Sequence, residues 1–522
     1  MVTPSRTSAG AGDDDVAALG KRYRQAVDRR QPWETLWRDC YANALPQRDG
    51  ALNDRSPGSA RTATLYDGTA PDAVEHLAAS LLSELTPPWS RWFALVPGRD
   101  AGPGDDLSTD DFSRSLDEAT ERLHGHFERS NFAVEVHQAY LDLVTAGTAS
   151  LLFEEAPVGD AAAFRFTAVP LGDVAFEEGD DGRLAVTFRH SRLTPAQFRR
   201  RFPAAGGSGI DPGNGADPAR RLSVVEAFTA DGEGCRYRAF SPDDGDPSAR
   251  ATEPGATLAE GRFLRSPFIN FRWLKAPGEI YGRSPVMKAL PDIKTANKVV
   301  ELVLKNASIA VTGIWQADDD GVLNPATVEL TPGTIIPKAV GSSGLTPLDT
   351  PGRFDVSEIV LESLRGRIRN ALMADDLGPA DKPGMTATEV VERAAAAGRR
   401  LGATVGRLQA ELLTPLVERA IMILVRRGEI APEVLDRGLV ELQWRAPLAR
   451  AQSRGEARDV MLWLESLARL GPEALAEVDP AAAARWLASS FGVPPSLVRR
   501  PAEPAAVLAD IAEAVLDTGA TP

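Results

Sequence analysis

The sequence predicts an α+β fold in which a mixed body is followed by unusually long helices. Apolar residues recur at helical spacing through much of the first 146 residues, whereas short β-rich runs separated by Gly and Pro fill residues 149–275. Residues 386–427 then have the pattern of one helix, which at about 1.5 Å per residue would be roughly 60 Å long. A monomeric enzyme seldom needs such a helix, so its length indicates a part of an assembly.

Composition and charge limit the possible functions. The chain has 522 residues, with 58 Lys and Arg against 73 Asp and Glu, for a formal net charge of −15. A protein that coats nucleic acid needs clustered cations to neutralise phosphates, so the net charge argues against this class, and any contact with DNA is expected to be weak. The helical centre is nevertheless mildly basic, because residues 286–306 carry four Lys against two acidic residues and residues 386–427 carry seven Arg against four Glu.

The cysteine content and the N-terminal sequence suit a protein of the reducing cytoplasm. Only Cys40 and Cys235 occur, with no CxxC and no His cluster, so neither a disulfide framework nor a zinc site is expected. The first residues lack the apolar core of a secretion signal, and no window has the 18 or more apolar residues of a membrane span. We expect no membrane association and no cofactor.

The first quarter of the chain is expected to be helical. Residues 1–14 offer almost nothing to bury and predict a flexible arm. Apolar residues at helical spacing follow on both sides of Pro32, and Pro46 ends the run. Further helices are expected at 69–85, 112–129 and 134–146, with an extended segment at 86–97 and an acidic loop at 101–111.

The next segments predict strands, then helices again. The expected strands are 150–153, 164–169, 184–188, 223–229, 236–240 and 268–273. Helices are expected at 286–306 and 354–373, with a strand-rich insert, 307–353, between them, and Pro415 should kink the long helix 386–427. The last expected helices are 454–470, 480–491 and 504–516.

The motif search gives no support for an enzyme. The acidic turn at 317–321 lacks the first and last ligands of a calcium loop, and no phosphate-binding loop or serine nucleophile elbow is complete. The five histidines include His124 and His126, which point to different faces of a predicted helix and cannot chelate a metal together. We interpret the histidines as solvated or core residues.

Two further features leave alternatives open. Trp89 and Trp92 lie beside prolines and apolar residues, which favours packing over the base stacking of single-strand binders. The loop 375–384 joins the two longest helical units, and the TATE sequence after it is typical of a helix start. This loop is either a solvated connection or a functional element.

Several strings in the sequence resemble the portal, or head-to-tail connector, proteins of short-tailed bacteriophages. They are LYDGTAPDAVEHLAASLLSELTPP, YGRSPVMKALPDIKTANKVVEL, VELTPGTI, MTATEVVER and LQAELLTPLVERAIMILVRRG. Their order and spacing carry the likeness, which extends from about residue 20 to residue 500. The resemblance implies a portal-type fold made of a wing, a stem, a clip, a spine and a crown.

The resemblance also assigns a part to each segment. It implies a flexible arm at 1–14, an α/β wing at 15–285, stem helices at 286–306 and 354–373, and a small β-rich clip at 307–353. The remaining parts are a tunnel loop at 374–385, a kinked spine helix at 386–427, and a wing return with a helical crown at 428–522. After residue 504 only one helix is expected, which speaks against a long internal barrel.

The functional implications follow from the same resemblance. Portal proteins form a ring, usually of twelve copies, at one capsid vertex, through which double-stranded DNA is packaged and ejected. The implied channel residues are Lys294, Lys298, Asp375, Asp376 and Lys382, and the implied clip residues for docking are Trp315, Asp318, Asp319 and Asp320. The implied partners are the terminase packaging motor, tail adaptors, capsid and scaffolding proteins, in the virion and, during assembly, in the host cytoplasm.

Two other classes of protein stay open at this point. An enzyme would need convergent polar residues around a pocket, and the sequence indicates none. A structural adaptor or scaffold protein of a phage-like particle that forms no ring fits the same sequence features. The oligomeric state separates this alternative from a portal.

Overall fold

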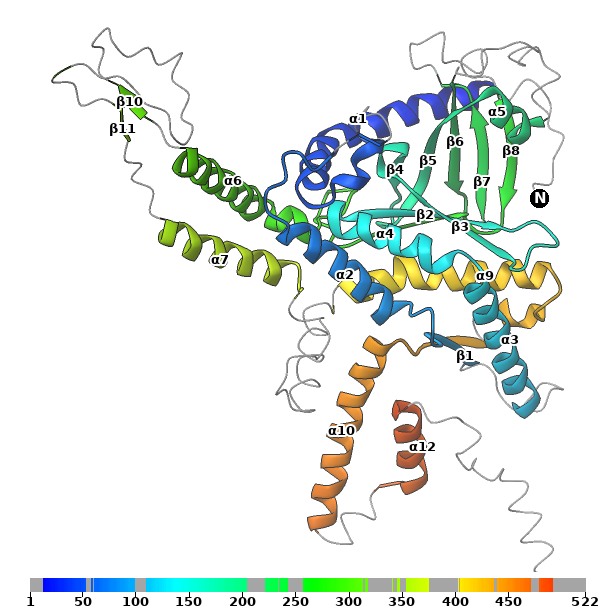
Figure 1. Cartoon of the computed structure of the whole chain (residues 1–522). Coiled ribbons are helices and arrows are strands. Elements are labelled where there is room, and N and C mark those ends of the chain that lie inside the picture. The colour runs from blue at the N-terminus through cyan, green and yellow to red at the C-terminus, as the bar shows by residue number, and fades with distance from the viewer. Residues whose placement is uncertain are drawn as a thin grey trace, which may run out of the picture.

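The computed structural model describes most of the chain. The described residues are 13–52, 58–59, 61–98, 109–203, 221–232, 234–242, 257–312, 315–317, 340, 345–347, 354–374, 402, 404–435, 439–470 and 478–491. Within them, helices and antiparallel strands form one body from which two helical units project (Figure 1). None of the described helices combines the length and the apolarity needed to cross a bilayer.

The N-terminal helices agree closely with the sequence pattern. They are α1 (Asp13–Ala44), α2 (Thr69–Leu85), α3 (Thr109–Arg129) and α4 (Phe132–Ala146), with a 3-10 turn, η1 (Pro46–Ala51), after α1. α1 is continuous through Pro32, since one proline removes a single helical hydrogen bond while Trp33 and Trp37 pack beside it. α1 already includes Asp13 and Asp14, which were expected in the arm, and α3 begins within the expected acidic loop.

Two antiparallel sheets form the centre of the body. The three-stranded sheet has the order β3-β2-β9, and the five-stranded sheet has the order β4-β5-β6-β7-β8. Their bounds are β2 (Thr148–Glu155), β3 (Phe164–Val169), β4 (Val174–Glu178), β5 (Leu184–Leu193), β6 (Leu222–Ala230), β7 (Cys235–Phe240), β8 (Thr257–Phe263) and β9 (Phe268–Arg272). A 3-10 turn, η2 (Leu171–Asp173), precedes β4, and α5 (Pro195–Arg201) follows β5. Of these elements, β4, β8 and α5 were not expected from the sequence.

The helices cover the sheets and bury a continuous apolar core. One face of the five-stranded sheet packs against α1, where Val16 and Leu19 meet Phe188 and Phe240 (Figure 1). The main core lies among α2, α4, the three-stranded sheet and α9 (Thr414–Arg426). Trp37 is fully buried in it, and its indole nitrogen donates to the Ala146 carbonyl at 3.1 Å.

Residues far apart in sequence complete the body. β1 (Phe93–Pro97) pairs with β12 (Val440–Trp444) in an antiparallel ribbon, so the chain returns to its N-terminal half after α9. The short 3-10 turn η5 (Pro432–Leu435) precedes this return. β12 was not predicted from the sequence, because a five-residue strand is stabilised mainly by pairing, and its partner β1 lies far away in the chain.

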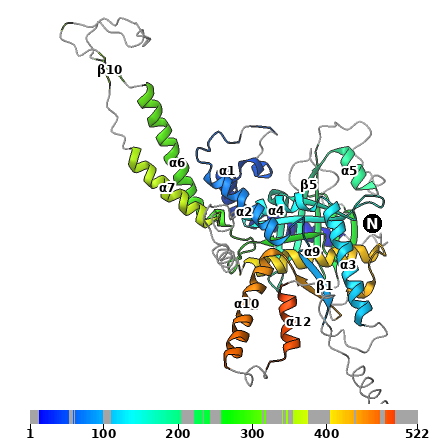
Figure 2. The same ribbon diagram turned by 60° about the horizontal axis from the view of Figure 1, so that its bottom comes forward.

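Two helical units project from the body on different sides (Figures 1 and 2). One consists of α6 (Pro285–Thr312) and α7 (Phe354–Ala371), with the short strands β10 (Trp315–Ala317) and β11 (Leu345–Pro347) paired between them. The other consists of α10 (Pro447–Leu470) and α12 (Pro480–Phe491). α6 runs beyond residue 306, into the range expected for the insert, and α10 begins before the expected residue 454.

The long helix expected at 386–427 is described only from residue 402 onward, and it is not uniform. Residues Gln409–Leu413 form a π-helical turn, in which the Thr414 amide donates to the Gln409 carbonyl five residues earlier. Because the ring of Pro415 would clash with the carbonyl four residues earlier in a regular helix, the widened turn accommodates it. The disturbance expected at Pro415 therefore takes the form of a π turn before α9.

Candidate functional site: the α6–α7 hairpin and its anchors

The α6–α7 hairpin begins at a tight contact with the body. Ser284 caps the start of α6, because its hydroxyl accepts from the Met287 amide at 2.9 Å and donates to the Thr145 carbonyl at 2.9 Å. Just before it, Gly282 lies against Gly147 at the end of α4, where a side chain at either position would collide with backbone atoms. Gly147 also has a φ of 77°, which favours glycine. The base of the hairpin is thus fixed by backbone contact.

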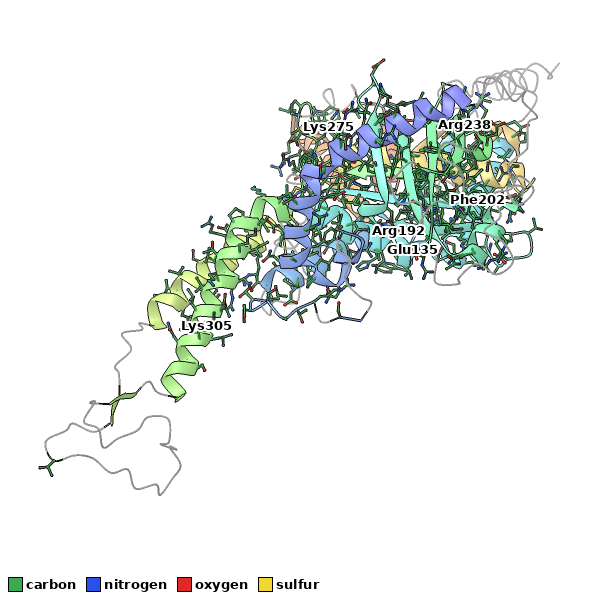
Figure 3. All side chains as sticks on the ribbon, turned by 90° about the horizontal axis from the view of Figure 1, so that it is seen from above. Glu135, Arg192, Phe202, Arg238, Lys275 and Lys305 are labelled. Atoms are coloured by element: carbon green, nitrogen blue, oxygen red, sulfur yellow. The ribbon has the colours of Figure 1, made fainter. Side chains whose placement is uncertain are left out.

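Lys294 and Lys298, the two predicted channel cations in the described residues, are both paired within the chain. The Lys294 ammonium lies 2.6 Å from Asp39 on α1, and the Lys298 ammonium lies 2.8 Å from Glu301. Glu301 also binds Lys305 at 2.6 Å, and the two lysines hold the pKa of the Glu301 carboxyl at about 2. Figure 3 shows Lys305 on the projecting part of α6, far from Arg238 in the body. The basic excess of α6 is therefore largely compensated locally.

The other predicted site residues are not brought together by the described structure. Asp375, Asp376 and Lys382, as well as Asp318, Asp319 and Asp320, lie outside the described residues. Trp315 begins β10, but only its backbone is described, where it pairs with Pro347 of β11. Their roles stay predictions.

A first anchor, missed in the sequence, joins the hairpin to the start of α2. Asn297 on α6 accepts from the amides of Tyr66 and Asp67 at 2.6 and 3.1 Å and donates to the Thr64 carbonyl at 2.9 Å. Asp67 accepts from the Arg365 guanidinium on α7 at 2.9 Å. Burial alone would raise the pKa of Asp67, but hydrogen bonds from Thr69 and Arg365 outweigh it and lower that pKa.

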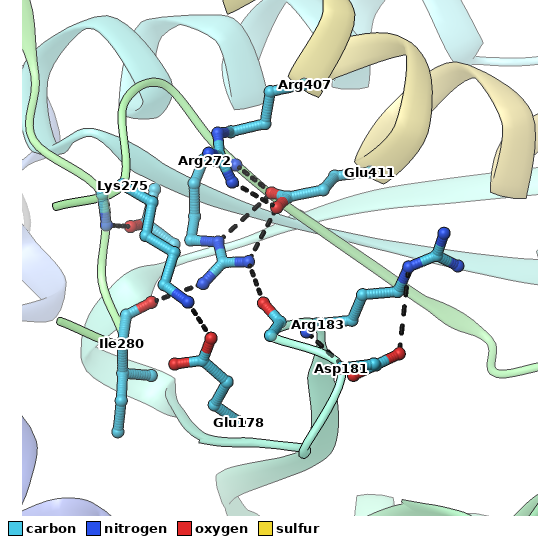
Figure 4. Close-up of polar contacts among 11 residues, drawn as sticks. Glu178, Asp181, Arg183, Arg272, Lys275, Ile280, Arg407 and Glu411 are labelled. Carbon is cyan, nitrogen blue, oxygen red and sulfur yellow. Dashed lines mark hydrogen bonds and ion pairs between the residues drawn. The ribbon is translucent and has the colours of Figure 1, made fainter. Parts of the chain in front are cut away.

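A second missed anchor fixes the π turn to the body (Figure 4). The Glu411 carboxylate accepts from the Arg272 guanidinium at 2.7 and 3.2 Å, from the Arg272 amide at 3.0 Å and from Arg407 at 3.1 Å. The Arg272 side chain is fully buried, and it also donates to the carbonyls of Ile280 and Gly182. The Arg272–Glu411 contact is bidentate, and each nitrogen of the Arg272 guanidinium donates at least one hydrogen bond. This buried ion pair therefore has a well-defined geometry.

The described residues show no group of side chains typical of a metal centre. No three His, Cys, Asp or Glu side chains among them gather closely enough to hold a metal ion. His124 is buried with Nε2 at 3.1 Å from the Phe93 carbonyl, and His126 contacts Glu429 at 2.6 Å. Trp92 packs in an aromatic cluster as expected, whereas Trp89 is 72% exposed, so packing explains only one of the two tryptophans.

A family model described as bacteriophage head to tail connecting protein matches residues 16–498. The chain belongs to this family. The probable portal protein of Bordetella phage BPP-1 is 26% identical over 512 residues, covering 92% of this chain and 88% of that protein. The portal protein of Salmonella phage epsilon15 is 22% identical over 515 residues, with 92% and 88% covered. A solved chain from the neck of an empty GTA particle covers 87% of this chain and 100% of its own length, with 12% identity and a TM-score of 0.39.

Membership in the head-to-tail connector family confirms the resemblance inferred from the sequence strings. It identifies the protein as a structural connector of a phage particle. The helices of the hairpin were expected from the sequence, whereas the two anchors could not be placed from sequence patterns alone. Asp67 and Arg365 lie 298 residues apart, and Arg272 and Glu411 lie 139 residues apart.

Proposed function

We propose that copies of this chain form a closed ring, of twelve subunits, at one vertex of the phage head. In this portal, the α6–α7 hairpin is the stem that lines a channel for double-stranded DNA. The body is the wing, residues 374–385 are the tunnel loop, residues 386–427 are the spine, and α10 with α12 belongs to the crown.

The observation that carries the proposal is the exposed apolar surface of the hairpin. Leu302 and Leu304 on α6 and Ile359 and Val360 on α7 are between 45% and 72% exposed, although they stand on a projecting unit. Fully burying such a side chain is worth about 1.5–3 kcal/mol, so neighbouring hairpins in a ring would gain stability by covering them. In a monomer these side chains stay exposed to water, so this stabilisation is absent.

The charge pattern of the hairpin fits a channel that must let DNA slide. A dense row of free cations would hold phosphates, because each released counterion adds affinity. Here Lys294, Lys298 and Lys305 have carboxylate partners within the same chain. Exposed pairs of this kind are weak, about 1 kcal/mol or less for a typical pair, so the lysines can exchange to a passing phosphate and return.

The proposed partners follow from the proposed parts. The clip, with Trp315 and Asp318 to Asp320, would dock the terminase motor during packaging and the tail adaptors afterwards. The wing and crown would face the capsid and scaffolding proteins. Assembly would take place in the host cytoplasm, and the role proposed for this chain is structural, with no catalytic step.

Mass photometry of the purified protein tests the ring directly. Twelve chains of 55.8 kDa give a species of about 670 kDa, as expected for a closed cyclic assembly. A second sample with Leu304 and Ile359 both changed to Lys should shift toward smaller species, since buried unpaired charges would oppose the contact. A protein that stays monomeric or dimeric at all concentrations would support the non-ring adaptor instead.

A further inference from the structure

The α10–α12 unit carries large apolar side chains that the described residues leave uncovered. On α10, Met461, Leu462, Trp463 and Leu470 are 44%, 51%, 51% and 77% exposed. On α12, Trp486 is 39% exposed. Both views in Figures 1 and 2 show the two helices projecting from the body side by side. Two helices alone cannot bury this much apolar surface.

The helical positions show where a third element would fit. Val460, Leu464 and Leu467 form the more covered side of α10. Trp463 and Leu470 are seven residues apart, so they share one flank beside that covered side. With Leu467 they form the 4-3 spacing of a coiled-coil seam. The flank is therefore shaped to receive another amphipathic helix.

One segment of this chain has the matching pattern. Residues 504–516 lie outside the described residues, and their sequence predicts a helix with Leu508, Ile511 and Val515 at 3-4 spacing. Both α10 and this segment therefore carry an apolar seam of heptad-like spacing.

Length and charge favour the same occupant. α12 runs back beside α10 and ends at Phe491, so residues 492–503 would connect it to the segment. Twelve extended residues reach about 40 Å, more than twice the roughly 18 Å length of α12. The segment and the residue after it carry Asp510, Glu513 and Asp517 and no basic residue, whereas α10 and α12 together carry five Arg against three acidic residues. The segment and the two described helices thus carry opposite net charge.

We propose that residues 504–516 dock as a helix on the flank formed by Trp463 and Leu470. The segment would run parallel to α10, with Leu508 beside Trp463 and Val515 beside Leu470, and would make a three-helix unit within one subunit. This inference does not depend on ring formation.

Engineered disulfides test the proposal in the full-length protein. Trp463→Cys with Leu508→Cys, and separately Leu470→Cys with Val515→Cys, should form a bond within one chain under mild oxidation. Disulfides need Cα atoms less than about 7 Å apart, so the test is local. The native Cys40 and Cys235 are buried and do not compete. As the control, Trp463→Cys with Ala506→Cys places the second thiol on the opposite face of the predicted helix.

The expected result is that at least one of the two pairs links several-fold more than the control, with the monomer mobility and the linked peptides of a single chain. Two pairs are used so that one destabilised variant does not decide the matter. Links between different chains would overturn the proposal, because a second copy would then occupy the flank. Absence of any link above the control in both pairs would overturn it as well.

Discussion

Glu411→Ala is expected to destabilise the body strongly, although Glu411 is not among the proposed channel residues. The substitution removes all four hydrogen bonds that the carboxylate accepts and leaves the Arg272 guanidinium, 0% exposed, without its counter-charge. Arg272 keeps only the carbonyls of Ile280 and Gly182 as partners. A buried cation in this state is much less stable than the paired one.

The expected loss of stability can be put into numbers. Removing one partner of a buried ion pair costs about 3–5 kcal/mol, which at about 2 °C per kcal/mol for a large domain lowers the melting midpoint by about 6–10 °C. Differential scanning calorimetry measures this shift. The matched control is Glu465→Ala on α10, whose carboxylate is 57% exposed and lies 2.6 Å from Arg469, so its loss should cost less than about 1 kcal/mol. Equal midpoints for the two variants would refute the assigned role of the Arg272–Glu411 pair.

Three further predictions concern the channel and acid stability. Reversing Lys294 and Lys298 to Glu should reduce DNA packaging in phage heads more than reversing both aspartates at 105–106, and equal effects would show that the stem faces are misassigned. Deleting residues 375–384 should leave rings intact by electron microscopy but impair packaging or retention, so normally filled heads would count against the tunnel loop. Burial lowers the pKa of His124 to about 4 from its ordinary 6.5, so the neutral imidazole stabilises the fold above pH 6.5 and that stability is lost as the pH falls toward 4. The loss approaches about 3 kcal/mol, and melting midpoints of His124→Phe should therefore fall less than those of the wild type over this pH range.

Local sequence signals predicted most of the regular elements. α2 was expected at 69–85 and is found at Thr69–Leu85, because its apolar residues recur at helical spacing after a start signal. β3 agrees with its expected bounds, Phe164–Val169, for the same local reason. β4, β8 and β12 were missed, since each is short and gains its stability from strands formed elsewhere in the chain.

The anchors of the site could not be predicted from one sequence. Nothing near Asp67 or Asn297 signals that they meet across α2, α6 and α7, and Glu411 is an ordinary acidic residue in a helical pattern. Pro415 was the local sign that this helix is irregular. The structure shows the irregularity as a π turn just before Pro415, and this turn carries Glu411, which contacts Arg272. Ion pairs between residues far apart in the chain produce no periodic pattern in the sequence, so they cannot be predicted from it.

The central claim is that many copies of this chain surround a channel. Averaged electron micrographs of the purified protein test it most directly, because they show both the symmetry and the hole. We expect rings of twelve subunits with an opening wide enough for duplex DNA and with the α6–α7 hairpins around it. Compact single particles without an opening, under every assembly condition tried, would contradict the claim.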